Sequence, residues 1–290
     1  MSTDKVEAFR KKVADADYWQ RERRPEDIAR LPVWAVVMAP FPSVAKYTQD
    51  TWMSDSGRFG RLEVALLSNR TQFGIPCGIS ARRALCLISR ALSGTKIHLG
   101  NGTKTLGELV EQSGGHASGG GPRSGREALR KAIQAILACH ITYQYRRPED
   151  LGVRDSLVVS PVLGLGEPDT LVKADPLRLI IREVNPSFLR LVRSGVPVDM
   201  RALRLVGRDA TTWDLLNFLA YRVRGVKKSD GILLLWEWLA DQMGSGMPLK
   251  SFKHHLTVEK IPKVRVLYPN LRATTEVDGV RLFSSDDFMS

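Results

Sequence analysis

Cysteine is scarce in this chain. The three cysteines, Cys77, Cys86 and Cys139, are odd in number and form no CxxC pair. That pattern supports neither a disulfide framework nor a zinc site, so we expect reduced thiols buried in a core. The five histidines include no His-x-His pair, and the sequence therefore predicts no metal site.

Long hydrophobic runs are also missing. No stretch approaches the roughly 20 apolar residues that a membrane-spanning helix needs. Residues 1–19 are charged throughout and lack the apolar segment of a signal peptide. We therefore expect a cytoplasmic protein without a membrane partner.

Nucleotide-binding motifs fail at each candidate position. The glycine-rich run SGGGPRSGRE has no GxxxxGK[ST] pattern, because residues 114–126 contain no lysine and Arg126 follows Gly125. The dinucleotide pattern GxGxxG is absent at 100–105, 119–124 and 164–169. We expect no cofactor, no catalytic residue and no enzymatic activity.

Positive charge, in contrast, is abundant. Lys and Arg number 43 against 31 acidic residues, which gives a formal net charge of +12. A globular chain of this charge usually has an anionic partner such as nucleic acid. Aromatic residues make up 7% of the chain and form no base-stacking cluster, so duplex DNA is favoured over RNA.

One order of elements occurs twice. A helix capped by Ser80, a short strand, a short helix, a basic helix and β-strands are expected at 80–92, 96–99, 105–112, 124–140 and 141–184. The same order, beginning with a helix capped by Asp209, recurs at 209–223, 232–235, 236–243, 249–262 and 272–283. This is the order of a winged helix, so we predict an α+β chain with two tandem winged-helix domains at 61–190 and 191–290. Residues 1–60 are expected to form an extension with a charged helix at 4–30 and a strand at 33–38, and 62–67 is expected to form a further strand.

Both basic helices have one apolar stripe and one cationic face. In the first, Leu129, Ile133, Ile136 and His140 share a face, and the cations lie opposite. In the second, Leu249, Phe252 and Leu256 face one way, and Pro262 is expected to kink or shorten the helix. The residues expected to contact DNA are Arg123, Arg126, Arg130, Lys131, Gln134, Arg146, Arg147, Lys250, Lys253, His254 and Thr257.

Several short segments resemble one known family. GIPCGISARRALCLISRAL (74–92) is similar to a conserved segment of plasmid replication initiators of the RepA type. VPVDMRALRLV, LLNFLAYRV, LLWEWLADQMG, LKSFKHHL, VLYPN and EVDGVRLF then match in the same order between residues 196 and 283. The chain departs from the family at Cys77, where an aromatic residue is usual, and at Pro262, which interrupts a helix that normally continues.

The resemblance implies a particular role and particular partners. Such initiators bind repeated sites (iterons) in double-stranded origin DNA, help to open the duplex, and recruit the host initiator and replicative helicase. A homodimer commonly represses the initiator's own promoter. Two alternatives remain: a winged-helix transcriptional repressor without an initiation role, and a rolling-circle nicking enzyme with Tyr143 or Tyr145 as nucleophile.

Overall fold

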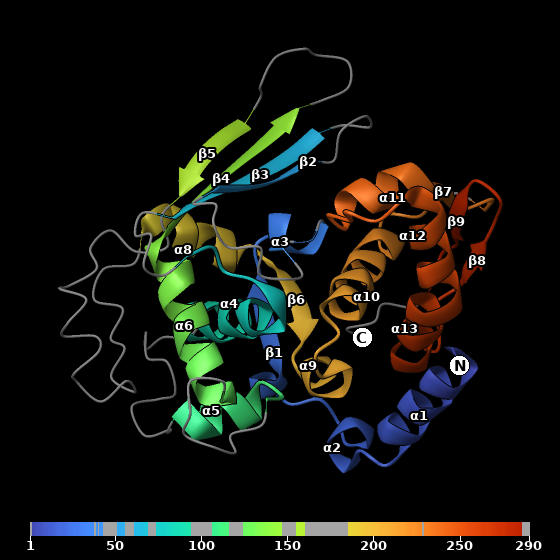
Figure 1. Ribbon diagram of the computed structural model, residues 1–290, viewed down its shortest axis with the longest axis horizontal. Helices are drawn as coiled ribbons and strands as arrows, with labels where there is room; N and C mark the ends of the chain where they lie inside the picture. Colours follow the sequence, from blue (N-terminus) through green and yellow to red (C-terminus); the bar gives the residue numbers. More distant parts are fainter. Residues whose placement is uncertain are drawn as a thin grey trace.

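Helices and antiparallel sheets surround one continuous apolar core (Figure 1). The computed structural model describes residues 2–37, 39, 41–42, 51–55, 61–68, 74–93, 106–115, 124–146, 155–159, 185–227 and 229–285. The α+β class is confirmed, whereas two winged-helix domains and the predicted domain boundaries stay predictions. No helix within these ranges is both long and apolar enough to cross a membrane.

The N-terminal segment differs from its prediction. The helix expected over residues 4–30 ends at Ala14. The strand expected at 33–38 is not present, because residues 34–37 form a short helix instead. An apolar run without alternation fits a short buried helix as well as a strand, and Trp34, Ala35 and Val36 are all buried. The elements are α1 (Ser2–Ala14), α2 (Asp17–Gln20), the 3₁₀ turn Pro25–Asp27, β1 (Ile28–Leu31) and α3 (Trp34–Val37).

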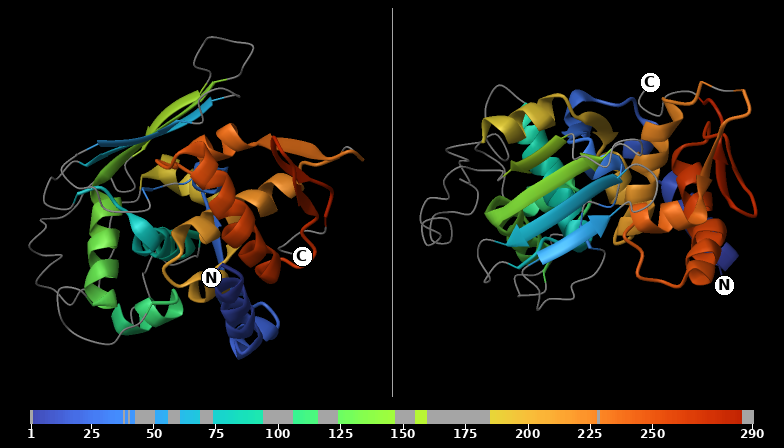
Figure 2. Two further views of the ribbon diagram at one scale, coloured as in Figure 1. Left: turned by 45° about the vertical axis from the view of Figure 1, so that its right-hand side comes forward. Right: turned by 90° about the horizontal axis from the view of Figure 1, so that it is seen from above.

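A four-stranded antiparallel sheet forms a layer above the helices α6 and α8 (Figures 1 and 2). Its strand order is β2-β3-β4-β5, and Val64 lies opposite Tyr143. The strands predicted at 62–67 and 141–145 are confirmed, whereas 96–99 and 177–184 lie outside the described residues. The strands are β2 (Thr51–Asp55), β3 (Arg61–Ser68), β4 (Cys139–Arg146) and β5 (Asp155–Val159).

The helices beneath this sheet begin in different ways. Ser124 accepts a hydrogen bond from the Glu127 amide and caps α6, at the position where the sequence predicts that the helix begins. Ser80 is not a cap, because α4 already begins at Gly78. These helices are α4 (Gly78–Ser93), α5 (Leu106–Gln112), α6 (Gly125–Ala138) and α8 (Pro186–Arg193).

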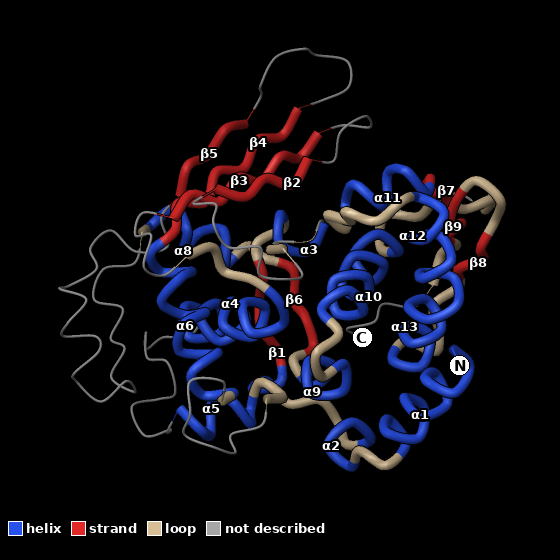
Figure 3. Tube along the Cα trace, viewed as in Figure 1, coloured by secondary structure: helices blue, strands red, loops and turns tan. Residues whose placement is uncertain are grey.

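The C-terminal part has the predicted order of helix, strand, helix, basic helix and hairpin (Figure 3). Its sheet has the order β7-β9-β8. Asp209 caps α10 through the Thr212 amide, as predicted. The elements are β6 (Val196–Asp199), α9 (Arg201–Val206), α10 (Ala210–Val223), β7 (Ile232–Leu235), α11 (Trp236–Gln242), α12 (Leu249–His255), the π-helical turn Leu256–Lys260, α13 (Ile261–Leu267), β8 (Ala273–Thr275) and β9 (Gly279–Leu282).

Pro262 does not shorten the second basic helix, so that part of the prediction is wrong, whereas the expected kink stays a prediction. The helical chain continues from α12 through a π-helical turn into α13. In the π turn the Ile261 amide donates to the Leu256 carbonyl, five residues earlier. A proline ring clashes with a normal α-helical turn, and the wider turn before Pro262 leaves room for it.

A buried ion pair joins the helices beneath the four-stranded sheet to the C-terminal part. Arg82 of α4 and Asp214 of α10 are both buried, and the Arg82 Nε lies 2.8 Å from Asp214 Oδ1. Arg82 also donates to the carbonyls of Gly78 and Phe41, each at 2.8 Å. The guanidinium therefore fixes α4, α10 and the segment after α3 at one point.

We expect Asp214→Ala to lower the free energy of unfolding by about 3–5 kcal/mol, because the substitution leaves Arg82 charged and unpaired in the core. Urea titration followed by circular dichroism measures this loss. The control is Glu7→Ala, which breaks an exposed ion pair with Arg10 and should cost less than about 1 kcal/mol. Equal losses of unfolding free energy in the two variants would contradict the role of Arg82 and Asp214 as a buried ion pair that holds the helices together.

Candidate nucleic-acid interface

The clearest cationic surface lies on α12. Phe252 is buried in the core, and Leu256 is buried one turn further along the helical chain. On the opposite side Lys250, His254 and Thr257 are exposed and Lys253 is half-buried. We call these four residues the α12 cationic face. The predicted division of this helix into an apolar and a cationic side is confirmed.

A hairpin is fixed beside the helix that carries this face. The Trp236 amide donates to the Asp278 carbonyl at 3.0 Å, and its indole Nε1 donates to the carbonyls of Glu276 and Val277. Arg265 of α13 donates to the Ala273 carbonyl in β8. The β8–β9 hairpin is thereby held to both α11 and α13.

An ion network fixes the other end of the same helical chain. Lys260 Nζ lies 2.7 Å from Asp209 Oδ2, and Lys263 Nζ lies 3.0 Å from the same oxygen. Lys263 also pairs with Glu259 at 2.7 Å. Asp209 thus caps α10 and anchors the turn that follows α12.

The charges of this network hold two carboxylates in the ionised form. Burial opposes ionisation of Asp209, but the bonds and charge of Lys260 and the bonds from Thr212 outweigh it and lower the pKa to about 2. Burial likewise opposes ionisation of Glu259, and Lys263 and Lys260 lower its pKa to about 2. Both carboxylates are therefore ionised at neutral pH.

The first turns of α6 carry the second predicted surface. Arg126 and Lys131 are exposed there. Arg130 instead pairs with Glu127, through Nε to Oε2 at 2.9 Å and Nη2 to Oε1 at 2.6 Å. The hydrogen bond from Arg130 lowers the pKa of Glu127 and keeps this pair ionised. A base contact by Arg130 would have to compete with this fork-shaped pair.

The outward face predicted for α6 does not extend past Lys131. Gln134 is buried at 8% exposure and accepts a long hydrogen bond, 3.5 Å, from Arg130. Its predicted outward position is wrong because residues 132–139 are buried on every side, with α6 packed against α4. Arg123 and Arg147 lie outside the described residues, and Arg146 ends β4.

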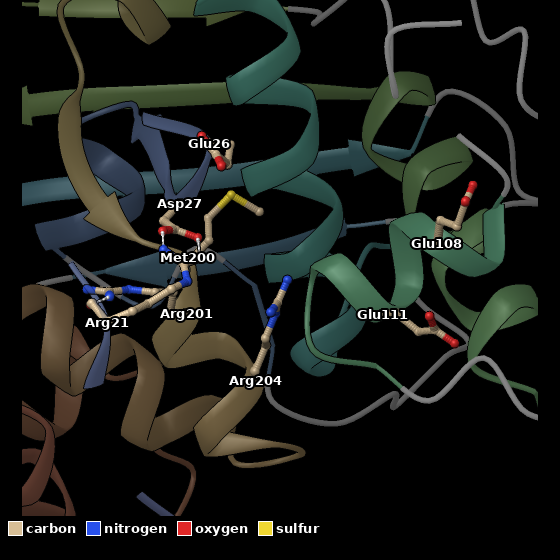
Figure 4. Close-up of a pocket in the computed structure, with 8 residues that line it drawn as sticks. All are labelled: Arg21, Glu26, Asp27, Glu108, Glu111, Met200, Arg201 and Arg204. Atoms are coloured by element: carbon tan, nitrogen blue, oxygen red, sulfur yellow. Dashed lines mark hydrogen bonds and ion pairs between the residues drawn. The ribbon is translucent and has the colours of Figure 1, made fainter. Parts of the chain in front are cut away.

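A separate polar cluster joins the N-terminal segment to β6 and α9 (Figure 4). Arg201 pairs with the buried Asp199 at 2.7 Å, and Arg21 pairs with Asp27 at 2.7 Å. The cluster borders a cavity of about 470 Å³ into which Arg204 points. Because Asp199 and Asp27 are each paired with an arginine, the cluster stabilises the β1–β6 pair.

Sequence reasoning missed the residues that position the two surfaces. Arg82 and Asp214 lie among the buried apolar residues of their helices, and a charge inside an apolar stripe was the available signal. Lys260 and Lys263 gave no such signal, because their partner Asp209 lies about fifty residues earlier. Among the described residues, no group of three or more His, Cys, Asp and Glu side chains could hold a metal ion.

Comparisons with known proteins give weak similarities. No family model matches the chain, and no curated protein sequence matches it. A crystal structure of RctB domains 2-3 is 12% identical and covers 82% of this chain and 83% of that chain, with a TM-score of 0.43. A selenomethionine structure of RctB domains 2 and 3 is also 12% identical and covers 89% and 95%, with a TM-score of 0.45. At these values the similarities assign neither a family nor a function.

We expect Asp209→Asn to lower the free energy of unfolding by about 2 kcal/mol at pH 7. Asparagine keeps the helix cap, so the loss reports the ion network alone. Since the folded-state pKa of Asp209 is lowered from 3.8 to about 2, its contribution is complete above pH 4 and disappears as the pH falls toward 2. Urea titrations of both proteins at several pH values measure this. If the difference in unfolding free energy between the parent protein and Asp209→Asn does not change with pH, the ion network does not stabilise the fold in this way.

Proposed function

We propose that this chain is a replication initiator that binds repeated sites in double-stranded origin DNA. The observation that carries the proposal is the α12 cationic face, which lies on an element order typical of a winged helix. Its Lys250, Lys253 and His254 lie near the start of the helix, the part that enters a major groove. The ordered matches between 196 and 283 add the initiator role to this DNA-binding role.

The α12 cationic face has the side chains that both kinds of DNA contact need. Lys250 and Lys253 suit phosphate groups, since ammonium groups act as compact point charges. His254 and Thr257, one turn apart, can form hydrogen bonds with base edges. Arg126 and Lys131 on α6 offer a second, smaller cationic surface. We propose that both surfaces meet one repeat.

The partners follow from the same resemblance. We propose that the protein acts in the cytoplasm, helps to open the duplex, recruits the host initiator and replicative helicase, and forms a homodimer when it represses its promoter. We further propose that it neither hydrolyses nucleotides nor cuts DNA, because the motifs for both reactions are absent from the sequence. Winged-helix repression without initiation is the second candidate, because duplex recognition uses the same surface.

Lys253→Gln should weaken binding to all duplex sequences alike and reduce the slope of log affinity against log salt by about one. The reason is the loss of one phosphate contact and its released counterion. Fluorescence anisotropy with a labelled duplex at several salt concentrations measures the slope. Lys11→Gln is the matched control, because Lys11 is exposed on α1 and should leave the slope unchanged. An unchanged slope in Lys253→Gln would contradict the proposed interface.

Opening of the duplex separates an initiator from a simple repressor. We expect the protein to make thymines reactive to permanganate on a supercoiled plasmid that carries direct repeats of a selected site beside an A·T-rich segment. Lys250→Gln/Lys253→Gln should abolish this reactivity. Tight, specific binding with no reactive thymines would favour the repressor instead.

A further inference from the structure

A cavity of about 1040 Å³ opens where the N-terminal helices, α4, α5, α6 and α9 meet. It lies apart from the α12 cationic face and uses none of its residues. The lining residues are Lys12, Tyr18, Ile79, Ser80, Arg83, Glu111, Gly114, Gly115, Ser124, Gly125, Ala128, Arg204, Gly207 and Arg208. Ligand-binding clefts in proteins are commonly of about this size.

Positive charge dominates the wall of this cavity. Four cationic side chains face one carboxylate, Glu111, so the lining carries a net charge of +3. Three of these cations form no ion pair within the part of the chain that the structure describes: Lys12, Arg83 and Arg208. Such a charge surplus in a recess is unusual, since cations brought together destabilise the fold unless an anion accompanies them.

Arg83 is the most enclosed of these cations. Its Nη2 donates to the carbonyls of Gly114 at 2.6 Å and Gly207 at 2.8 Å. These bonds orient the guanidinium without neutralising it, and its buried Nε has no partner among the described residues. Burial and then the charge of Arg208 lower the pKa of Arg83 to about 10. An anion in the cavity would offset both the burial of the Arg83 charge and its repulsion by Arg208.

Backbone groups add to the positive potential. Ser124 and Gly125 at the start of α6 line the cavity, as do Ile79 and Ser80 in the first turn of α4. Helix N-termini carry partial positive charge and donate amide hydrogen bonds to anions.

A glycine keeps the space around Arg83 open. A Cβ atom added at Gly115 would lie 2.5 Å from a Val110 methyl group and 3.3 Å from the Arg83 Nη1. An alanine at this position would clash with Val110 and crowd the Arg83 guanidinium.

We propose that this cavity binds a small molecule that carries two or more phosphate groups. The net charge of +3 matches a diphosphate or triphosphate, and guanidinium groups bind phosphate oxygens in pairs. Because the cationic groups converge from α1, α4 and the end of α9, they can surround a compact polyanion on several sides. This proposal does not rest on the proposed DNA-binding function.

Isothermal titration of the full chain with inorganic tripolyphosphate, at constant ionic strength and without DNA, tests the proposal. We expect binding that weakens about tenfold or more in Arg83→Gln and in Arg208→Gln, which each lose a charged hydrogen-bond donor. Lys227→Gln is the control, because Lys227 is exposed beyond the far end of α10 and makes the same charge change. It should bind within about twofold of the parent protein.

Thermal unfolding of each variant shows whether it is folded. Arg83 holds two carbonyls, so if its variant unfolds, Arg208→Gln decides the question, since Arg208 is exposed. Absence of tripolyphosphate binding by the parent protein would overturn the proposal, as would equal weakening in Lys227→Gln. Two further results together would also contradict the proposal: Arg208→Gln weakens duplex binding as much as tripolyphosphate binding, and duplex DNA displaces tripolyphosphate. The cavity would then bind DNA phosphates and not a small molecule.

Discussion

Arg82 and Asp214 form the contact on which the relation between the two halves of the molecule depends. A buried arginine and a buried aspartate would each be costly alone, and together they tolerate burial because each of the three guanidinium nitrogens donates to an acceptor. The pair acts on α10, which is itself buried along most of its length. Since Asp209 at the start of α10 also holds the turn after α12, one helix connects the core ion pair to the candidate DNA-binding surface.

This connection holds the α12 cationic face in a fixed position on the core. The face has Phe252 and Leu256 behind it, the β8–β9 hairpin beside it, and the Asp209 network at its far end. Contacts that read DNA must be held in fixed geometry, because a loose side chain loses more entropy on binding. The α6 surface is less exposed, since Glu127 occupies Arg130 and the core encloses the rest of the helix.

Local patterns predicted much of this fold. The strand at 62–67, the start of α6 near Ser124, the cap at Asp209 and the final hairpin all follow from periodicity and capping, which act over a few residues. The apolar run at 33–38 gave the wrong element, because a short buried helix and a buried strand have the same composition. The predicted exposure of Gln134 was wrong for a different reason, because the packing of α6 against α4 decides it and the periodicity of its own helix does not.

The candidate interfaces were predicted unevenly for the same reason. Charge and helical spacing on α12 located its exposed cations, because the buried Phe252 fixes which side faces outward. The other parts of the candidate sites depend on contacts between residues far apart in the sequence. The match of Lys260 with Asp209, and the meeting of Lys12, Arg83 and Arg208 around one cavity, join segments far apart in the sequence. No pattern within a short window can show such a contact.

We propose that the α12 cationic face contacts duplex DNA while the folded frame behind it stays unchanged. Lysine acetylation, read by mass spectrometry with and without a bound duplex, tests this most directly. We predict that Lys250 and Lys253 lose reactivity when the duplex binds. Lys260 should react slowly in both states, because it is buried against Asp209, and the exposed Lys11 should react equally in both. Unchanged reactivity of Lys250 and Lys253 in a complex that contains bound duplex would contradict the account.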